Sequence, residues 1–228
     1  MKVLIAEDDE HTRRGLAEIL EAEGYEALLA RDGQEALGLF EREAPDFVCL
    51  DIMMPAVTGY DVCRRIRQHS PSVPIIFISA KSEEIDKVIG LELGADDFIT
   101  KPFGVKEVVA RIRAVTRRTL AARPTPEAGF SFRLGDLEVL PAELRARRGG
   151  RTIELSLRDV RLLELFYNNP GKVLDRNAIF NACWGARYLP NSRTLDQHIS
   201  QLRKRIEPDP KNPALIRTVH GVGYRYDE

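Results

Sequence analysis

Carboxylates stand directly after two of the most apolar segments of the sequence. Glu7 and Asp8 follow KVLIA, and Asp51 follows FVCL. If these segments are neighbouring strands of a parallel sheet, the three carboxylates meet at one sheet edge, where they repel each other unless a cation neutralises them. Oxygen ligands without His or Cys suit a hard ion such as Mg²⁺, or Mn²⁺. The residues therefore predict a divalent cation site made of Glu7, Asp8 and Asp51.

Asp51 is also a candidate nucleophile. A carboxylate beside such a cation can attack phosphorus, because the charge of the transferred group is spread over the cation and nearby donors. Ser79 and Lys101 are the candidate donors, since they follow two later apolar segments, PIIFI and FIT. Any one of these acids alone would indicate a solvated loop. Together, the five positions indicate phosphoryl chemistry at Asp51.

The elements that must position these residues alternate between strands and helices. Apolar runs predict strands, and amphipathic stretches predict the helices between them. FVCL is apolar throughout, which suits a central strand covered on both faces. We expect an α/β, flavodoxin-like, doubly wound parallel sheet of order 2-1-3-4-5. Its strands are expected at residues 2–6, 26–29, 47–50, 74–78 and 97–99, and its helices near 11–23, 33–43, 59–68, 84–93 and 104–118.

These motifs resemble a known family. In order and spacing, AEDDE, FVCLDIMMP, IIFISA and GADDFITKPF are similar to the receiver domain of bacterial two-component response regulators. The resemblance implies that a sensor histidine kinase phosphorylates Asp51 and that the Met53 carbonyl is a further metal ligand. It implies that Ser79 and Lys101 bind the phosphoryl oxygens. Phe98 would be the aromatic switch, turning inward as Ser79 moves toward the phosphoryl group.

The resemblance carries further expectations for the receiver. Relatives use only two adjacent acids for metal at the first corner, so Asp9 is not expected to be a ligand. The bond before Pro102 is expected to be cis. Met53 and Lys81 flank the site without a water-positioning group, which predicts slow hydrolysis of the phosphoryl group. Phosphorylation is expected to drive homodimerisation through salt bridges between subunits that involve Lys87, Asp97, Glu107 and Arg111.

The second half of the chain differs in charge and in pattern. Residues 1–120 carry 16 basic and 22 acidic residues, a net charge of −6, whereas residues 121–228 carry 18 and 13, a net charge of +5. The proline-containing segment TLAARPTPEAG separates the halves. We expect a receiver domain at 1–119, a linker at 120–129 and an effector domain at 130–228.

The effector sequence predicts an α+β domain. FRLG, LEVL, ELRARR and RTIEL suggest a small antiparallel meander. Three helices are expected: one capped by Ser156 that runs to Asn168, one at about 174–182, and a basic one capped by Asn191 or Ser192 that reaches Ile206. LIRTV, the turn HGVG and YRY follow as a hairpin. A basic helix followed by a hairpin is suited to a DNA groove and the neighbouring backbone.

This half resembles the winged helix-turn-helix effector of OmpR/PhoB regulators. The similarity lies in VRLLELFYNNPGKVLDRNAIF, CWGARYLPNSRTLDQHISQLRKRIEPD and LIRTVHGVGYRY. It implies sequence-specific binding to double-stranded DNA, at tandem repeats, and a loop at residues 181–190 that touches RNA polymerase. The phosphate contacts it implies are Trp184, Arg193, Thr194, His198, Arg203 and Tyr224. The groove contacts are Gln201, Lys204, Thr218 and His220.

Composition is consistent with a soluble cytoplasmic protein. The first residues form no signal peptide, and no apolar run approaches the roughly 20 residues that span a bilayer. Cys49, Cys63 and Cys183 form no CxxC pair, so we expect no disulfide and no structural zinc.

Two other classes of protein are compatible with the first half. A phosphohydrolase with an aspartyl nucleophile would need an acid at position 53, where this chain has Met53. A flavodoxin-like cofactor binder would need a phosphate-cradling loop after the first strand, where this chain has EDDE. We therefore expect no enzyme activity beyond the chain's own phosphorylation and slow dephosphorylation. The sequence contains no motif that identifies the stimulus, the partner kinase, the target promoters or the sign of regulation.

Overall fold

The computed structural model describes residues 1–80, 84–122, 130–184 and 192–227. Within helices, the side chains of 84–87, 122, 192 and 193 are not described. Contacts divide the chain into two compact units, Met1–Thr119 and Leu120–Glu228. We call them the receiver unit and the effector unit.

The receiver unit has five parallel strands in the order β2-β1-β3-β4-β5. The strands are β1 (Lys2–Ala6), β2 (Glu26–Ala30), β3 (Phe47–Leu50), β4 (Ile75–Ser79) and β5 (Asp97–Thr100). The helices are α1 (Glu10–Glu23), α2 (Gly33–Glu43), α3 (Gly59–His69), α4 (Glu84–Glu92) and α5 (Val105–Ala122). The predicted fold class and strand order are confirmed.

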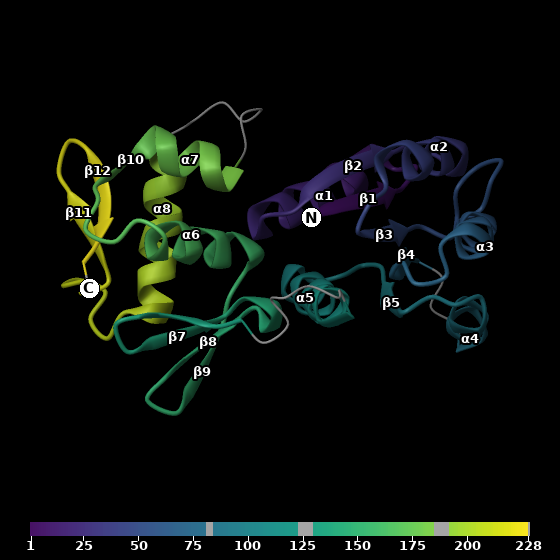
Figure 1. The fold of residues 1–228 in the computed structure, drawn as a ribbon. Helices are drawn as coiled ribbons and strands as arrows, with labels where there is room; N and C mark the ends of the chain where they lie inside the picture. Colours follow the sequence, from purple (N-terminus) through teal and green to yellow (C-terminus); the bar gives the residue numbers. More distant parts are fainter. Residues whose placement is uncertain (81–83, 123–129, 185–191, 228) are drawn as a thin grey trace. The chain divides into compact units, whose positions relative to one another are not determined.

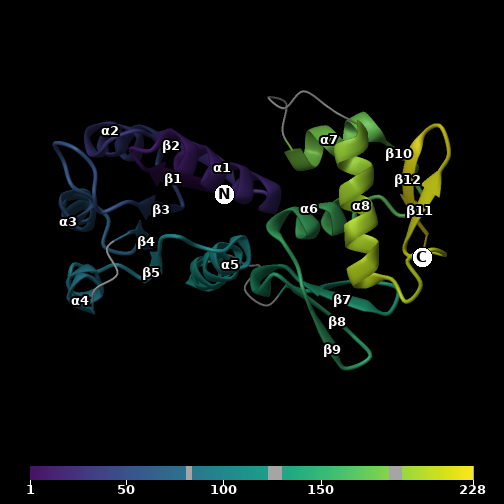
Figure 2. The ribbon, with the colours of Figure 1, turned by 180° about the vertical axis from the view of Figure 1, so that it is seen from behind.

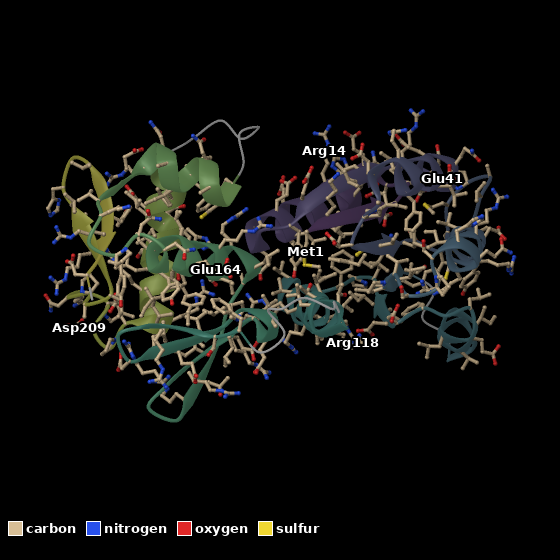
Figure 3. All side chains as sticks on the ribbon, in the orientation of Figure 1. Met1, Arg14, Glu41, Arg118, Glu164 and Asp209 are labelled. Atoms are coloured by element: carbon tan, nitrogen blue, oxygen red, sulfur yellow. The ribbon has the colours of Figure 1, made fainter. Side chains whose placement is uncertain are left out.

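Helices cover both faces of this sheet, with α1 and α5 on one side and α2, α3 and α4 on the other (Figure 1). The central strands β3 and β4 are buried along their whole length, as their unbroken apolar sequences predict. Side chains fill the space between the sheet and the helices (Figure 3). This packed core fixes the strand ends, where the acidic residues lie.

Helix α5 is longer than the sequence pattern predicted. It runs through Ala122, so the first three residues of the predicted linker, 120–122, are helical. The residues TLAA favour or tolerate helix, and the first residue that disfavours it is the one before Pro124. The sequence signal against a helix therefore comes later than we expected.

The effector unit contains two antiparallel sheets. Four strands form the first sheet in sequence order: β6 (Phe132–Leu134), β7 (Leu137–Leu140), β8 (Arg145–Arg148) and β9 (Arg151–Glu154). A short 3-10 helix, η1 (Pro141–Glu143), interrupts the expected strand ELRARR. The second sheet has the order β10-β12-β11, with β10 (Leu174–Asp175), β11 (Ile216–Val219) and β12 (Gly223–Tyr226). We call residues 216–226 the wing.

Three helices complete the effector unit: α6 (Leu157–Tyr167), α7 (Arg176–Trp184) and α8 (Ser192–Ile206). Ser156 caps α6 as predicted, and Ser156 with Asp159 forms a reciprocal capping box. The two-residue strand β10, which the sequence did not reveal, occupies the place where we expected α7 to begin. Both views place α8 between α6 and the wing (Figures 1 and 2).

Gly223 allows the wing to close against β10. A Cβ at this position would lie 1.9 Å from the Leu174 carbonyl oxygen, which is far too close for any side chain. The wing is thereby tied to the start of α7. Among the described residues, no helix is long and apolar enough to cross a membrane.

Candidate phosphorylation site and DNA-binding surface

The ends of β1 and β3 bring the predicted acidic residues together. Ala6 pairs with Leu50, and the Asp51 backbone N–H donates to the Ala6 carbonyl at 2.8 Å. One oxygen from each of Glu7, Asp8 and Asp51 lies within 4.8 Å of the other two. Glu7 and Asp51 are buried, whereas Asp8 is exposed. The three acids that the sequence singled out therefore form one cluster with an open side.

Lys101 reaches this cluster from the end of β5. Its Nζ lies 2.6 Å from Asp51 Oδ2 and 2.6 Å from Glu7 Oε2. The peptide bond between Lys101 and Pro102 is cis, as the resemblance implied. The Lys101 backbone N–H donates to the Ser79 carbonyl at 2.9 Å, which places Ser79 at the same sheet edge. All five predicted site residues thus stand at the carboxyl ends of the strands.

One lysine does not balance three carboxylates. Burial raises the pKa of Glu7 from 4.5 to about 7; the ion pair with Lys101 opposes this shift, and the negative charge of Asp51 adds to it. Burial would lower the pKa of Lys101, but its contacts with Asp51 and Glu7 outweigh burial and raise that pKa. The cluster keeps an excess of negative charge that a divalent cation would neutralise.

The residues fit a bound cation. Glu7 Oε2 is buried and accepts no hydrogen bond of good geometry from the described residues, although Lys101 lies within ion-pair distance. An ion pair of poor hydrogen-bond geometry leaves this buried oxygen only partly satisfied, and metal coordination would complete its contacts. The donor set consists of oxygen atoms, as Mg²⁺ and Mn²⁺ prefer.

Asp9 and Met53, which lie next to the cluster in the sequence, make different contacts. Asp9 caps α1, and its Oδ1 accepts a hydrogen bond from the Thr12 N–H at 2.7 Å. Its carboxylate therefore has a structural role, in line with the expectation that it is not a metal ligand. Met53 is 59% exposed, and its backbone N–H donates to Asp51 Oδ1 at 3.1 Å. Lys81 lies outside the described residues.

The loop after Asp51 depends on a glycine at the start of α3. A Cβ at Gly59 would lie 2.1 Å from the Asp51 carbonyl oxygen. Only glycine therefore permits the close approach by which the Gly59 N–H donates to the Ile52 carbonyl at 3.0 Å. Thr58 caps the helix through the Asp61 N–H. These contacts fix the backbone that carries the Met53 carbonyl.

The candidate switch residues lie beside the site. Ser79 is fully buried at the end of β4, and Phe98 on β5 is partly buried. The ring centroids of Phe98 and Phe77 are 6.4 Å apart. A Cβ at Gly90 of α4 would lie 3.0 Å from Phe77, so α4 packs closely on this pair. Phe98 is thus in contact with the core without being enclosed by it.

The residues predicted for dimerisation pair within the chain. Arg111 Nη1 lies 2.8 Å from Asp97 Oδ1, and Arg111 Nη2 lies 3.1 Å from Glu107 Oε1. Burial would lower the pKa of Arg111, but Asp97 and Glu107 raise it. The Lys87 side chain lies outside the described residues. Three of the four residues therefore form one charged cluster on β5 and α5.

In the effector unit, α8 carries most of the predicted DNA contacts. Gln201 and Lys204 are exposed on the helix, and His220 is exposed on the wing. Thr194 and Thr218 are partly exposed, and the Arg193 side chain lies outside the described residues. Leu195, Ile199, Leu202 and Ile206 are buried on the opposite side, as the sequence periodicity predicted.

Arg203 and Tyr224 make internal contacts between α8 and the wing. Arg203 donates to the Ile216 carbonyl at 2.9 and 2.6 Å and to Thr218 Oγ1 at 2.9 Å. Tyr224 is 4% exposed, and its hydroxyl donates to Asp196 Oδ1 at 2.5 Å. Burial raises the pKa of Tyr224 to about 12, and its hydrogen bond to Asp196 adds to the shift. Both residues hold the wing against the helix, whatever they contact in a complex.

Sequence reasoning missed a residue at the other side of α8. Asp159 of α6 is fully buried; its Oδ2 lies 2.6 Å from Arg205 Nη1, and its Oδ1 lies 3.0 Å from His198 Nε2. Burial would raise the pKa of Asp159, but His198 and Arg205 outweigh it and lower that pKa. His198 also meets the Trp184 ring edge-on at 5.4 Å. Two residues predicted to contact phosphate thus pack between α6, α7 and α8.

A second missed residue is Glu207, which follows α8. It is 6% exposed, and its carboxylate accepts hydrogen bonds of 3.0 Å from the N–H groups of Ala214, Leu215 and Ile216. The carboxylate thereby fixes the start of the wing relative to α8. The sequence offered only a weak signal, a single acid at the end of a basic helix.

Comparisons with known proteins agree with this architecture. Residues 3–113 match the family described as response regulator receiver domain, and residues 150–226 match transcriptional regulatory protein, C terminal. The sensory transduction protein RegX3 of Mycolicibacterium smegmatis is 44% identical, over 99% of this chain and 98% of its own length. The alkaline phosphatase synthesis transcriptional regulatory protein PhoP of Bacillus subtilis is 40% identical, over 100% and 97%.

The solved receiver domain of Francisella response regulator 1452 is 34% identical, with a TM-score of 0.50, over 52% of this chain and 98% of that one. Similarity therefore extends through both units, and the family regulates transcription rather than catalysing metabolic reactions. It implies a histidine kinase partner and DNA as ligand. The chain belongs to the OmpR/PhoB family of two-component response regulators.

Proposed function

We propose that Asp51 accepts a phosphoryl group from a sensor histidine kinase and that this modification promotes receiver dimerisation and sequence-specific DNA binding. The observation that carries the proposal is the cluster of Glu7, Asp8 and Asp51 at the strand ends, with Lys101 2.6 Å from Asp51. A site with excess negative charge needs a cation, and the cation prepares it for a phosphoryl group.

In the proposed transfer, an Asp51 carboxylate oxygen attacks the phosphorus of a phosphohistidine. The new O–P bond gives an acyl phosphate, and the breaking N–P bond returns its electron pair to the histidine ring. A bound Mg²⁺, held by Glu7, Asp8, Asp51 and the Met53 carbonyl, would supply charge neutralisation for the phosphoryl oxygens. Lys101 would turn from the Asp51 carboxylate to a phosphoryl oxygen.

Residues next to the site would couple phosphorylation to receiver dimerisation. Ser79 would move toward the phosphoryl group and Phe98 would turn inward, which changes the surface of α4, β5 and α5. Lys87, Asp97, Glu107 and Arg111 would then pair across a symmetric dimer. Because exposed ion pairs are individually weak, apolar contacts must contribute as well. A sedimentation experiment with Mg²⁺ and a phosphoryl mimic would contradict the dimer if the chain stayed monomeric.

A receiver dimer would present two effector units to tandem DNA repeats. We keep the boundaries 1–119, 120–129 and 130–228 for receiver, linker and effector. Phosphate contacts are proposed for Trp184, Arg193, Thr194, His198, Arg203 and Tyr224, and groove contacts for Gln201, Lys204, Thr218 and His220. RNA polymerase is the proposed partner of residues 181–190, of which 181–184 belong to α7 and 185–190 lie outside the described residues.

A phosphotransfer assay tests the proposal directly. The full chain is incubated with a phosphorylated histidine kinase or a small acyl phosphate, with and without Mg²⁺, and its intact mass is measured. Wild type should gain one phosphoryl group only with Mg²⁺, and Asp51→Asn should gain none. Asp9→Asn is the matched control, because Asn also caps a helix and Asp9 lies outside the acid cluster. Equal labelling of Asp51→Asn would refute the assignment.

The lifetime of the phosphoryl group is a separate part of the proposal. Met53 is exposed and offers no acid or amide to orient a water molecule toward phosphorus. Hydrolysis should therefore be slow in the purified protein. Loss of the label within seconds would argue that another group positions the attacking water.

A further inference from the structure

The exposed stripe of α8 is chemically unusual for a basic helix. Among the side chains of α8 that the structure describes, five residues form it: Asp196, Gln197, Ser200, Gln201 and Lys204, all of them exposed. At 3.6 residues per turn, they span about 140° of the helix, centred opposite the buried stripe. This stripe is the part of α8 that a DNA groove can reach.

The arginines that follow it in the sequence point elsewhere. Arg203 lies on the flank toward the wing, where it donates to the Ile216 carbonyl and to Thr218 Oγ1. Arg205 lies on the opposite flank and pairs with the buried carboxylate of Asp159 at 2.6 Å. The guanidinium group is the usual reader of guanine in the major groove. The fold has therefore removed both groups from the reading surface.

The acidic residue of the stripe, Asp196, also forms contacts within the effector unit. Asp196 Oδ1 accepts the Tyr224 hydroxyl at 2.5 Å and lies 3.3 Å from Arg176 Nε. These contacts hold Oδ1 toward the wing and α7, at one edge of the stripe. Beside this carboxylate, the described side chains of the stripe offer two amides, one hydroxyl and one ammonium for base contacts.

We propose that Gln197 and Gln201 specify adenine in the DNA half-site. The proposal rests on the DNA binding proposed above and names its sequence class. A glutamine amide can donate to adenine N7 and accept from the adenine N6 amino group, a pairing that no other base offers in the major groove. Ser200, which lies between the two amides, tolerates several bases, and Lys204 is a cation at the end of the stripe.

The helix geometry sets the distance between the two adenines. Gln197 and Gln201 are one turn apart, and four residues rise roughly 6 Å along a helix. Base pairs stack at roughly 3.4 Å. The two specified adenines should therefore lie within two base pairs of each other, on the same strand or on opposite strands.

Selection from a random DNA library tests this inference with the full chain, Mg²⁺ and a phosphoryl mimic. Wild type should enrich sequences with two such adenines. Replacing either one by 7-deazaadenine, which lacks the N7 acceptor, should weaken binding roughly 5- to 150-fold. Gln197→Ala and Gln201→Ala should each relax the preference at one position, and Gln201→Arg should change its position to guanine.

Gln68→Ala, an exposed glutamine on α3, is the matched control and should leave the selected sequence unchanged. Fluorescence of Trp184, the only tryptophan, establishes that each variant is folded. Enrichment of guanine by wild type, or an unchanged preference in both alanine variants, would overturn the inference while DNA binding stands. If no sequence is enriched, the proposed DNA binding fails, and the adenine assignment fails with it.

Discussion

Each unit of this regulator contains a buried carboxylate that contacts cations, and the two are balanced differently. In the receiver unit, Glu7 and Asp51 share Lys101 with Asp8 nearby, so three acids face one lysine. In the effector unit, the single carboxylate of Asp159 contacts Arg205 and His198 and also accepts the Ser156 N–H at 2.7 Å. The receiver cluster has fewer positive charges than carboxylates, whereas both carboxylate oxygens of Asp159 already have partners.

The difference distinguishes a site suited to bind a ligand, in the receiver unit, from a site that stabilises the fold, in the effector unit. An under-neutralised cluster stores unfavourable electrostatic energy that a bound cation releases. A saturated carboxylate gains nothing from a ligand, and it fixes α8 against α6. Removing an acid should therefore have opposite effects on stability in the two units.

The largest effect is expected from Asp159→Ala. The change leaves Arg205 and His198 without their buried anion, which should cost about 3–5 kcal/mol of effector stability. Urea unfolding followed by the fluorescence of Trp184 measures the effector unit selectively. Glu154→Ala is the control, because Glu154 forms an exposed pair with Arg145 and should cost less than about 1 kcal/mol. If Asp159→Ala and Glu154→Ala lost the same unfolding free energy, the buried ion pairs of Asp159 would contribute no more than an exposed pair.

Glu7→Gln should change stability in the opposite direction. Without divalent cations at about pH 8, removing one charge from the crowded cluster should stabilise the receiver unit by about 1–2 kcal/mol, allowing for solvent screening. Hydrogen exchange of the β1 and β3 amides measures this. Mg²⁺ should protect wild type and have little effect on the variant. Glu10→Gln, an exposed acid of α1, should change nothing, and a destabilised Glu7→Gln would contradict the excess of negative charge.

The same comparison predicts a pH dependence. The pKa of Glu7 is raised from 4.5 to about 7 in the folded chain, because burial disfavours its charged form. Its contribution to stability is fully present below pH 4.5 and is lost as the pH rises through about 7. Metal-free wild type should therefore lose receiver stability across this window relative to Glu7→Gln. A constant difference between the two proteins would show that Glu7 does not titrate there.

The smallest effect is expected from Ser156→Ala. Ser156 accepts the Asp159 N–H at 3.0 Å within the capping box, and its loss should cost about 1 kcal/mol of effector stability. Ser156→Asn should retain most of the stability, since Asn also caps helices. If Ser156→Ala matched the cost of Asp159→Ala, the capping bond rather than the ion pairs would dominate this site.

Much of the receiver could be predicted from its sequence. Five apolar segments, of which FVCL is the clearest, gave the strands, and the doubly wound order brought Glu7, Asp8 and Asp51 to one edge. Each acid directly follows a strand, so its position in space follows from its position in the chain. The end of α5 was misjudged by a few residues, because helix ends carry weaker signals than strand cores.

The effector was less predictable at the level of side chains. Periodicity identified the buried stripe of α8, but it did not show that Arg203 turns to the wing or that Arg205 turns to Asp159. Those partners lie 13 and 46 residues away in the sequence. The strand β10 was missed because two residues are too short for a pattern.

The sequence by itself determined the two units, the five residues of the proposed phosphorylation site and the basic helix with its wing. Local periodicity and strand-end positions are sufficient for these features, because they depend on short-range order along the chain. Only the tertiary structure decided which charged side chains form contacts within the fold. Lys101 leaves the acidic cluster of the receiver under-neutralised, whereas Asp159 and the Ile216 carbonyl occupy two arginines of α8. Long-range packing turns these two arginines away from the exposed stripe of α8, whose described side chains include two glutamines.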